Sequence, residues 1–184
     1  MLNAAARTFS KDGIRGATTR EIAKKAGVNE VTLFRHFKSK EQLLGAVIET
    51  GLVSELALMN AQASWGENLR ENLARYAKHY YEHLEKKEAF ARALIAESGT
   101  LPESVQTMIT RVVKPVRDRL IEMLKVAQKA GVICSDLDVE CAIDAFKNTL
   151  CAGMLRQSSC LPRNYSANAY IDAVVDIFFR GMEA

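Results

Sequence analysis

Apolar residues recur at the spacing of an α-helix along the whole chain, and turn residues are scarce between them. The opening segment already shows the pattern, because Leu2, Ala5, Ala6 and Phe9 stand at positions i, i+3, i+4 and i+7. The 184 residues include only 10 glycines and 3 prolines, whereas an all-β protein of this length needs many more turn residues. The pattern therefore predicts an all-α protein of about nine helices.

Capping signals indicate where the expected helices begin. The segments Thr18-Thr19-Arg20-Glu21, Ser39-Lys40-Glu41-Gln42 and Thr100-Leu101-Pro102-Glu103 have the form of a capping box, in which two side chains satisfy backbone N–H groups at a helix start. Pro115 lies inside the long seventh stripe, so we expect a kink or a division there. The remaining start and stop signals are Gly13, Gly27, Asn29, Gly99, Gly131, Asp136 or Asp138, and Ser166.

The composition is that of a folded protein without a membrane span. Hydrophobic residues make up 48% of the chain and charged residues 26%, which excludes a disordered or low-complexity chain. No run approaches the ~18 to 20 uncharged apolar residues that a membrane span needs, since even the apolar stretch near the C-terminus contains Asp176. The first residues lack the basic and apolar regions of a signal peptide, so we expect a cytoplasmic protein with no membrane partner.

Positive charge is concentrated in the first 50 residues, which hold nine Lys and Arg against five Asp and Glu, a net charge of +4. The whole chain has a formal net charge of +3, so the remainder carries −1. A basic N-terminal part on a near-neutral body favours a head that binds a polyanion. We therefore expect a DNA-binding domain at residues 1–48 and a separate helical domain at residues 49–184.

A helix-turn-helix is predicted within this basic part. One helix can end at Gly27 and the next can be capped by Asn29, which leaves one residue between them. Two helices joined in this way can place the second helix in the DNA major groove. Lys40 and nearby hydroxyls are suited to phosphate, and Arg35 to a base edge. The candidate DNA contacts are Thr18, Thr19, Arg20, Asn29, Glu30, Thr32, Arg35, His36, Ser39 and Lys40.

Residues 2–48 resemble the N-terminal signature of the tetracycline-repressor (TetR) family of transcription regulators. Two departures from that signature add candidate DNA contacts: Phe34 stands where the family usually has a tyrosine, and Val31 where a glycine often precedes the threonine. The residues that carry the resemblance are Phe9, Gly13, Thr18, Ile22-Ala23, Ala26-Gly27-Val28, Thr32-Leu33, Phe37, Lys40 and Leu43-Leu44. The resemblance implies a repressor that a small-molecule inducer releases from a palindromic operator.

The same resemblance implies that residues 49–184 bind the inducer and form a homodimer. The expected lining of the inducer pocket is Met59, Trp65, Tyr76, His79, Tyr80, Phe90, Glu97, Met108, Phe146 and Met154. Broad apolar stripes on the last two helices also favour a four-helix dimer interface. Its expected residues are Ala142, Ala145, Phe146, Thr149, Leu150, Gly153, Tyr170, Val174, Ile177 and Phe178.

Several other interpretations compete with this one. The segment His79-Tyr80-Tyr81-Glu82-His83 matches a zinc-peptidase pattern, but Tyr80 is needed on the core side of the helix and no further ligand cluster stands out. The chain contains no Gly-rich phosphate loop and no GxSxG elbow, so we expect neither an enzyme nor a cofactor or metal. A constitutive architectural DNA-binding or protein-interaction factor without an inducer is the alternative. The cysteines form no CxxC pair and are expected in the core, although redox sensing at Cys141 or Cys151 remains an alternative.

Overall fold

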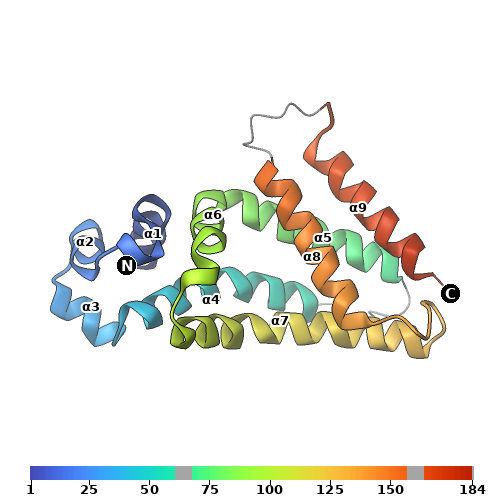
Figure 1. The fold of residues 1–184 in the computed structure, drawn as a ribbon, viewed down its shortest axis with the longest axis horizontal. Helices are drawn as coiled ribbons and strands as arrows, with labels where there is room; N and C mark the ends of the chain where they lie inside the picture. Colours follow the sequence, from blue (N-terminus) through green and yellow to red (C-terminus); the bar gives the residue numbers. More distant parts are fainter. Residues whose placement is uncertain (61–67, 157–163, 184) are drawn as a thin grey trace. The chain divides into compact units, whose positions relative to one another are not determined.

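The computed structural model describes residues 1–60, 68–156 and 164–183, and in these ranges it is built from α-helices (Figure 1). This confirms the predicted all-α class. A short 3₁₀ turn and one isolated bridge between Ile133 and Glu183 complete the regular structure of the described part. The helices are α1 (Leu2–Gly16), α2 (Thr19–Lys25), α3 (Glu30–His36), α4 (Lys40–Asn60), α5 (Leu69–Lys86), α6 (Glu88–Glu97), α7 (Glu103–Lys129), α8 (Val139–Arg156) and α9 (Ala167–Met182), with the 3₁₀ turn η1 (Ser98–Thr100) before α7.

Five predicted helix starts carry the expected side-chain caps, and at the start of α4 Ser39 accepts from the backbone N–H of Gln42 at 3.2 Å. Thr18 accepts a hydrogen bond from the backbone N–H of Glu21 at 3.2 Å, and Ser166 caps α9 in the same way at 3.1 Å. Asp138 accepts from two N–H groups at the start of α8, both at 3.0 Å. Asn29 caps α3, because its side chain accepts a hydrogen bond from the backbone N–H of Val31. A helix cap depends on residues within one turn, and for this reason the sequence predicts it well.

The capping box predicted at Thr100 is wrong. Thr100 belongs to the 3₁₀ turn, and its hydroxyl donates to the backbone oxygen of Glu97 at 3.0 Å instead of accepting at the start of α7. Of the kink or division expected at Pro115, the division does not occur, because α7 runs as one helix through the proline. Within the described residues, no helix is long and apolar enough to cross a membrane.

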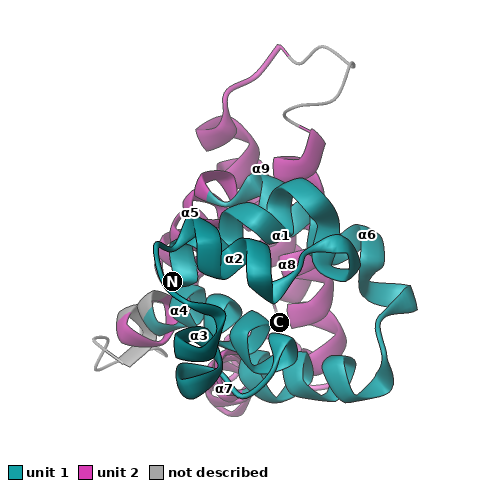
Figure 2. Cartoon of the chain, turned by 90° about the vertical axis from the view of Figure 1, so that its left-hand side faces the viewer, with its two compact units in different colours: residues 1–53, 87–114 teal, residues 54–86, 115–184 magenta. Residues whose placement is uncertain are grey.

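The chain divides into two compact units, shown in different colours in Figure 2. Unit 1 comprises residues 1–53 and 87–114, and unit 2 comprises residues 54–86 and 115–184. Helices α4 and α7 contribute to both, and the division in α7 falls at Pro115. The unit that holds the predicted helix-turn-helix therefore also contains α6 and the first half of α7, beyond the expected boundary at residue 48.

The core of unit 1 joins segments that lie far apart in the chain. Phe9 of α1 and Ile22 of α2 are fully buried, and Leu33 of α3 is 1% exposed. The ring of Phe9 packs against that of Phe90 in α6, with 6.3 Å between the ring centroids. Burying such side chains stabilises a fold by ~1.5 to 3 kcal/mol each, so α6 is a structural partner of the N-terminal helices.

In unit 2, helices α5, α8 and α9 pack against one another. Tyr170 of α9 lies across Gly153 of α8 so closely that a Cβ atom at Gly153 would collide with the tyrosine ring. The Tyr170 hydroxyl donates to the backbone oxygen of Thr149 at 2.8 Å. The rings of Phe146 and Phe178 meet edge to face, with centroids 5.3 Å apart. Gly153 is therefore needed for the close packing of α8 against α9 within one chain.

Candidate nucleic-acid interface

A tight turn at Gly27 sets the direction of α3 relative to α2. Gly27 has φ of 68°, a left-handed conformation that favours glycine. Its N–H donates to the oxygen of Lys24 at 3.2 Å, and the N–H of Val28 donates to the oxygen of Ala23 at 3.1 Å. This pair of bonds is a Schellman motif, which satisfies the last carbonyls of α2. The turn is therefore fixed by its own backbone.

Helix α3 presents a solvent-accessible face beside one buried anchor. The side chain of Asn29 accepts from the N–H of Val31 at 3.0 Å, which caps the helix. Leu33 points into the core, whereas Val31 is 66% exposed and Phe34 is 42% exposed. Arg35 and His36 are exposed as well. One face of α3 thus combines accessible apolar and basic side chains, which are the types that read thymine methyl groups and guanine edges in a major groove.

Two predicted contact residues bond to each other. The Thr19 hydroxyl donates to Oε1 of Glu30 at 2.6 Å, so this bond ties the start of α2 to the start of α3. Both side chains are half-buried, as is Thr32. Thr18 is occupied as the cap of α2, and Arg20 beside it is exposed. Thr19 and Glu30 therefore hold the two helices together.

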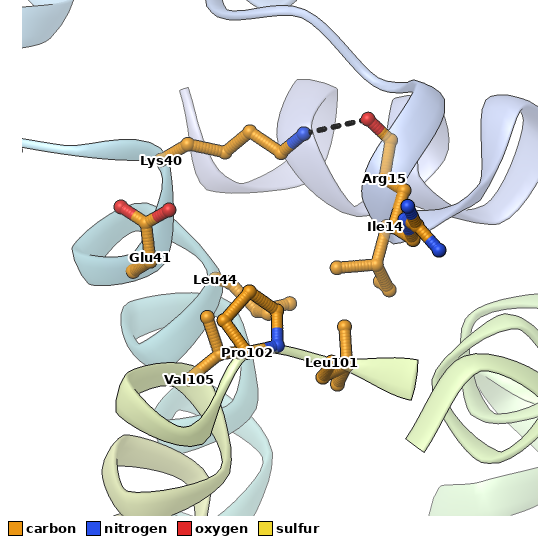
Figure 3. A pocket seen from close by; sticks show the side chains of 8 residues that line it. All are labelled: Ile14, Arg15, Lys40, Glu41, Leu44, Leu101, Pro102 and Val105. Atoms are coloured by element: carbon orange, nitrogen blue, oxygen red, sulfur yellow. Dashed lines mark hydrogen bonds between the residues drawn. The ribbon is translucent and has the colours of Figure 1, made fainter. Parts of the chain in front are cut away.

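Lys40 bonds to the backbone at the end of α1 (Figure 3). Its ammonium donates to the carbonyl oxygens of Arg15 at 2.9 Å and Ala17 at 2.8 Å. An ammonium has three N–H donors, so these two bonds leave one donor for another acceptor. Lys40 therefore joins α4 to the end of α1 and keeps one donor that could meet a phosphate.

Lys40 also lines a pocket of about 230 Å³ in unit 1. The pocket lies between the end of α1 and the starts of α4 and α7, and its floor is apolar (Figure 3). None of the residues expected to bind an inducer lines it. The lining residues are Ile14, Arg15, Lys40, Glu41, Leu44, Leu101, Pro102 and Val105.

The structure places Glu97 at a break in α1. The backbone of Gly13 has φ of 75°, and the two following N–H groups bond to the Glu97 carboxylate: Ile14 at 2.7 Å and Arg15 at 2.9 Å. A Cβ atom at Gly13 would collide with that carboxylate. Glu97 thus caps the last turn of α1 from the end of α6. Glu97 was expected to line an inducer pocket, but in the structure its carboxylate is bonded to the backbone of α1 within unit 1.

Two other residues expected in the pocket also lie in unit 1. Phe90 is part of the core that contains Phe9. Met108 packs on Gly45, where a Cβ atom would come within 2.6 Å of its sulfur. Trp65 lies outside the described residues, and so does the side chain of Met59.

The remaining expected pocket residues lie in unit 2. Tyr76 is fully buried, Phe146 is 2% exposed and Met154 is fully buried, whereas His79 and Tyr80 are half-buried. The rings of Tyr76 and Tyr80 are stacked with centroids 5.7 Å apart. Tyr76, Phe146 and Met154 thus belong to the buried core of α5 and α8, whereas His79 and Tyr80 keep accessible surface.

Sequence reasoning missed two charged residues that lie beside these tyrosines. Glu55 of α4 is 1% exposed and accepts a hydrogen bond from the Tyr76 hydroxyl at 3.1 Å. The Lys147 ammonium lies 4.9 Å from the centroid of the Tyr80 ring. Burial raises the pKa of Glu55 and lowers the pKa of Lys147, because it disfavours charge on either group. The sequence did contain a signal for them, because Glu55 and Lys147 both stand among apolar residues at helical spacing.

The residues expected at a dimer interface fall into two groups. Phe146, Leu150, Gly153 and Val174 are buried inside their own chain. Ile177 is 69% exposed. The other members keep partial or full exposure: Ala142, Ala145, Thr149, Tyr170 and Phe178.

Among the residues that the structure describes, no group of three or more His, Cys, Asp or Glu side chains lies close enough together to hold a metal ion. His79 and His83 each take part in interactions of their own. The described cysteines do not lie in the core as expected, because Cys141 is exposed and Cys134 and Cys151 are half-buried. Burial raises the pKa of the Cys151 thiol, and neighbouring Asp138 raises that of Cys141. A raised thiol pKa disfavours the reactive thiolate.

Comparisons with known proteins agree with this arrangement. The chain is 27% identical over 150 residues to the uncharacterized HTH-type transcriptional regulator YvkB of Bacillus subtilis, which covers 82% of this chain and 77% of the relative. It is 24% identical over 179 residues to the HTH-type transcriptional repressor KstR2 of Rhodococcus jostii, which covers 96% and 88%. Its fold is similar to that of the transcriptional regulator FadR from Bacillus subtilis in complex with stearoyl-CoA, with a TM-score of 0.77, 19% identity, and coverage of 99% and 97%.

Two family models match the chain. Residues 1–47 match the model of bacterial regulatory proteins of the tetR family, and residues 66–178 match that of the tetracyclin repressor-like C-terminal domain. The second match alone spans more than half of the chain, and the first contains the whole helix-turn-helix. This chain therefore belongs to the tetR family of helix-turn-helix transcription regulators, which are not enzymes.

Proposed function

We propose that this protein is a cytoplasmic, homodimeric repressor that binds a palindromic operator and is released from it by a small-molecule inducer. The observation that carries the DNA-binding part is the accessible face of α3. It follows a turn fixed by backbone hydrogen bonds, and it is held to α2 by the bond between Thr19 and Glu30. A recognition helix with such a rigid base can present its side chains to a major groove without further ordering.

The proposed contacts divide into positioning and reading. Exposed Arg20 and the third donor of Lys40 are suited to phosphate oxygens, which fix the register of a protein on a duplex. Arg35 is suited to a guanine edge, and exposed Val31 and Phe34 to thymine methyl groups. Asn29 and His36 lie at the two ends of the same helix.

A dimer would repeat this surface about a two-fold axis. The exposed side chain of Ile177 on α9 and the accessible residues of α8 supply an apolar patch for such an isologous contact. Two recognition helices related in this way would meet half-sites one helical turn, or a multiple of it, apart. The palindromic operator follows from that symmetry.

Release by a ligand requires two states of the dimer with different affinity for DNA. A ligand that prefers the weakly binding state shifts the population, and a coupling of ~1 to 3 kcal/mol per site is typical. The similar fold seen with stearoyl-CoA supports a small molecule as the effector of this chain. We place the binding site of this small molecule at the polar residues of unit 2.

The test measures binding of the full chain to the DNA upstream of its own gene by fluorescence anisotropy. We expect Arg35→Ala to cost ~1 to 3 kcal/mol at one operator position and to relax discrimination there. Lys78→Ala removes an exposed positive charge from α5 and serves as the control. A uniform loss over all operator variants would contradict base reading by Arg35. Operator binding that no candidate small molecule weakens would favour the constitutive architectural factor.

A further inference from the structure

A column of polar side chains passes between three helices of unit 2. It consists of Glu55 from α4, Tyr76 and Tyr80 from α5, and Lys147 from α8, and we call it the Glu55–Lys147 column. The Tyr76 hydroxyl donates to Oε2 of Glu55 at 3.1 Å, and the two tyrosine rings stack at an angle of 10°. The Lys147 ammonium lies over the far ring, 4.9 Å from its centroid.

Two groups at the Lys147 end of the column have unused hydrogen-bond donors. Among the described residues, neither the Lys147 ammonium nor the Tyr80 hydroxyl has a hydrogen-bond partner. An ammonium offers three N–H donors and a phenol one O–H donor. Buried polar groups in proteins are normally bonded, so unused donors at one place call for an acceptor.

These two groups are not simply facing open water. Burial raises the pKa of Tyr80 and lowers that of Lys147, which shows that their surroundings disfavour charge. Both side chains nevertheless keep part of their surface accessible. Both groups therefore lie in desolvated surroundings and still have surface that a ligand can reach.

The ammonium also lacks a close counter-charge. No carboxylate of the described residues is within ion-pair distance of Lys147. Glu55 is engaged by Tyr76, and Asp144, one turn before Lys147 on α8, pairs with Arg117 at 3.1 Å. A desolvated ammonium without a counter-charge is costly, so binding of an anion next to Lys147 would be strongly favoured.

We propose that the Glu55–Lys147 column is the ligand site of unit 2 and takes a monocarboxylic acid with an apolar body. The Lys147 ammonium and the Tyr80 hydroxyl hold the carboxylate, and Glu55 disfavours ligands with a second negative charge. The neighbouring turns of α5 and α8 supply the buried apolar residues Leu73, Ala77, Leu150 and Met154. This inference rests on the proposed ligand-controlled function, and it names the class of ligand.

A cationic ligand fits the column less well. Glu55 and two aromatic faces could attract a cation, but the carboxyl already accepts from Tyr76, and the protein's own Lys147 occupies the face of Tyr80. Only an acceptor group would use the donors that the column leaves free. The chemistry at this site therefore favours an acid over an amine.

The experiment uses the full chain without DNA and isothermal titration calorimetry. The probes are octanoate, decanoate and 4-phenylbutyrate, each compared with its primary amide, and octylamine as a cation. We expect at least one of the acids to bind about 10- to 100-fold more tightly than its amide, as charge-assisted hydrogen bonds require. Lys147→Met keeps the length of the side chain and should abolish this preference. Tyr80→Phe should weaken binding of the acid by several-fold.

Lys78→Met is the matched control, because it removes an exposed lysine from α5 of the same unit. Circular dichroism checks that each variant is folded, and Lys147→Arg, which keeps the charge, should retain the preference for the acid. The proposal is overturned if no acid binds more tightly than its amide, or if Lys78→Met has the same effect as Lys147→Met. Octylamine binding that Glu55→Gln abolishes would overturn it too.

Operator binding measured in parallel separates this inference from the proposed function. DNA binding together with a lack of Lys147-dependent acid binding would refute the ligand class and leave the DNA-binding function standing. Lys147-dependent acid binding that leaves the DNA complex unchanged would support the site and refute release by that ligand.

Discussion

Glu97 in unit 1 and Glu55 in unit 2 both accept hydrogen bonds, but from different kinds of donor. Glu97 accepts from two backbone N–H groups and so fixes the path of α1. Glu55 accepts from the hydroxyl of Tyr76, at one end of a column whose other end keeps free donors. Bonds to backbone hold one conformation, whereas bonds among side chains can be exchanged for bonds to a ligand. This contrast agrees with the proposed roles, in which unit 1 presents a fixed surface to DNA and unit 2 binds a ligand.

The largest effect is expected when a charge is placed on the exposed apolar patch of unit 2. Ile177→Asp should leave each chain folded, because the side chain is 69% exposed. It should yield monomers with little affinity for a palindrome, since an unpaired carboxylate in an interface costs several kcal/mol. Sedimentation equilibrium and anisotropy measure the two effects.

Val174→Asp provides the contrast on the same helix. Val174 is 4% exposed, so a carboxylate there should unfold unit 2 instead of dissociating a dimer. A wild-type protein that sediments as a monomer at micromolar concentration, and still binds the palindrome with full affinity, would contradict the dimer.

The next effect concerns the fixed path of α1 in unit 1. Glu97→Ala removes two charge-assisted bonds to backbone and should lower the free energy of unfolding by ~1.5 to 3 kcal/mol. It should also weaken operator binding, because the end of α1 leads directly into the helix-turn-helix. Thermal unfolding and anisotropy are the measurements, and Glu85→Ala, at an exposed position of α5, is the control. Unchanged operator affinity despite lowered stability would show that Glu97 does not position the head.

The sequence predicted local features of this fold better than long-range ones. Caps such as Thr18 and Asp138 were found because their partners lie within one turn. The role of Glu97 was missed because its bond to Ile14 joins residues 83 positions apart, and no periodicity reports such a contact. Lys147 was missed because the expected pocket was drawn from aromatic residues and methionines, with His79 and Glu97 as its only other members.

A smaller effect is expected at Lys40, which bonds to backbone and has one donor left. Lys40→Ala should lower the free energy of unfolding by ~1 to 2 kcal/mol through loss of the bonds to Arg15 and Ala17. If the third donor meets a phosphate, the salt slope of log affinity should fall by about one as well. Lys38→Ala, at an exposed neighbouring position, should leave stability unchanged. A loss of stability with an unaltered salt slope would assign Lys40 to structure alone.

The smallest effect is expected at the accessible face of α3, where Phe34→Tyr adds one hydroxyl at a side chain that is 42% exposed. The added group needs no burial, so the stability of unit 1 should not change. If Phe34 faces the DNA, the hydroxyl can bond to a phosphate and should tighten binding by ~0.5 to 1.5 kcal/mol. Phe34→Leu removes the ring as well, and anisotropy on both variants separates the contribution of the ring from that of the hydroxyl. Equal affinity of Phe34→Tyr and wild type, with the fold intact, would mean that α3 meets the DNA with a different face.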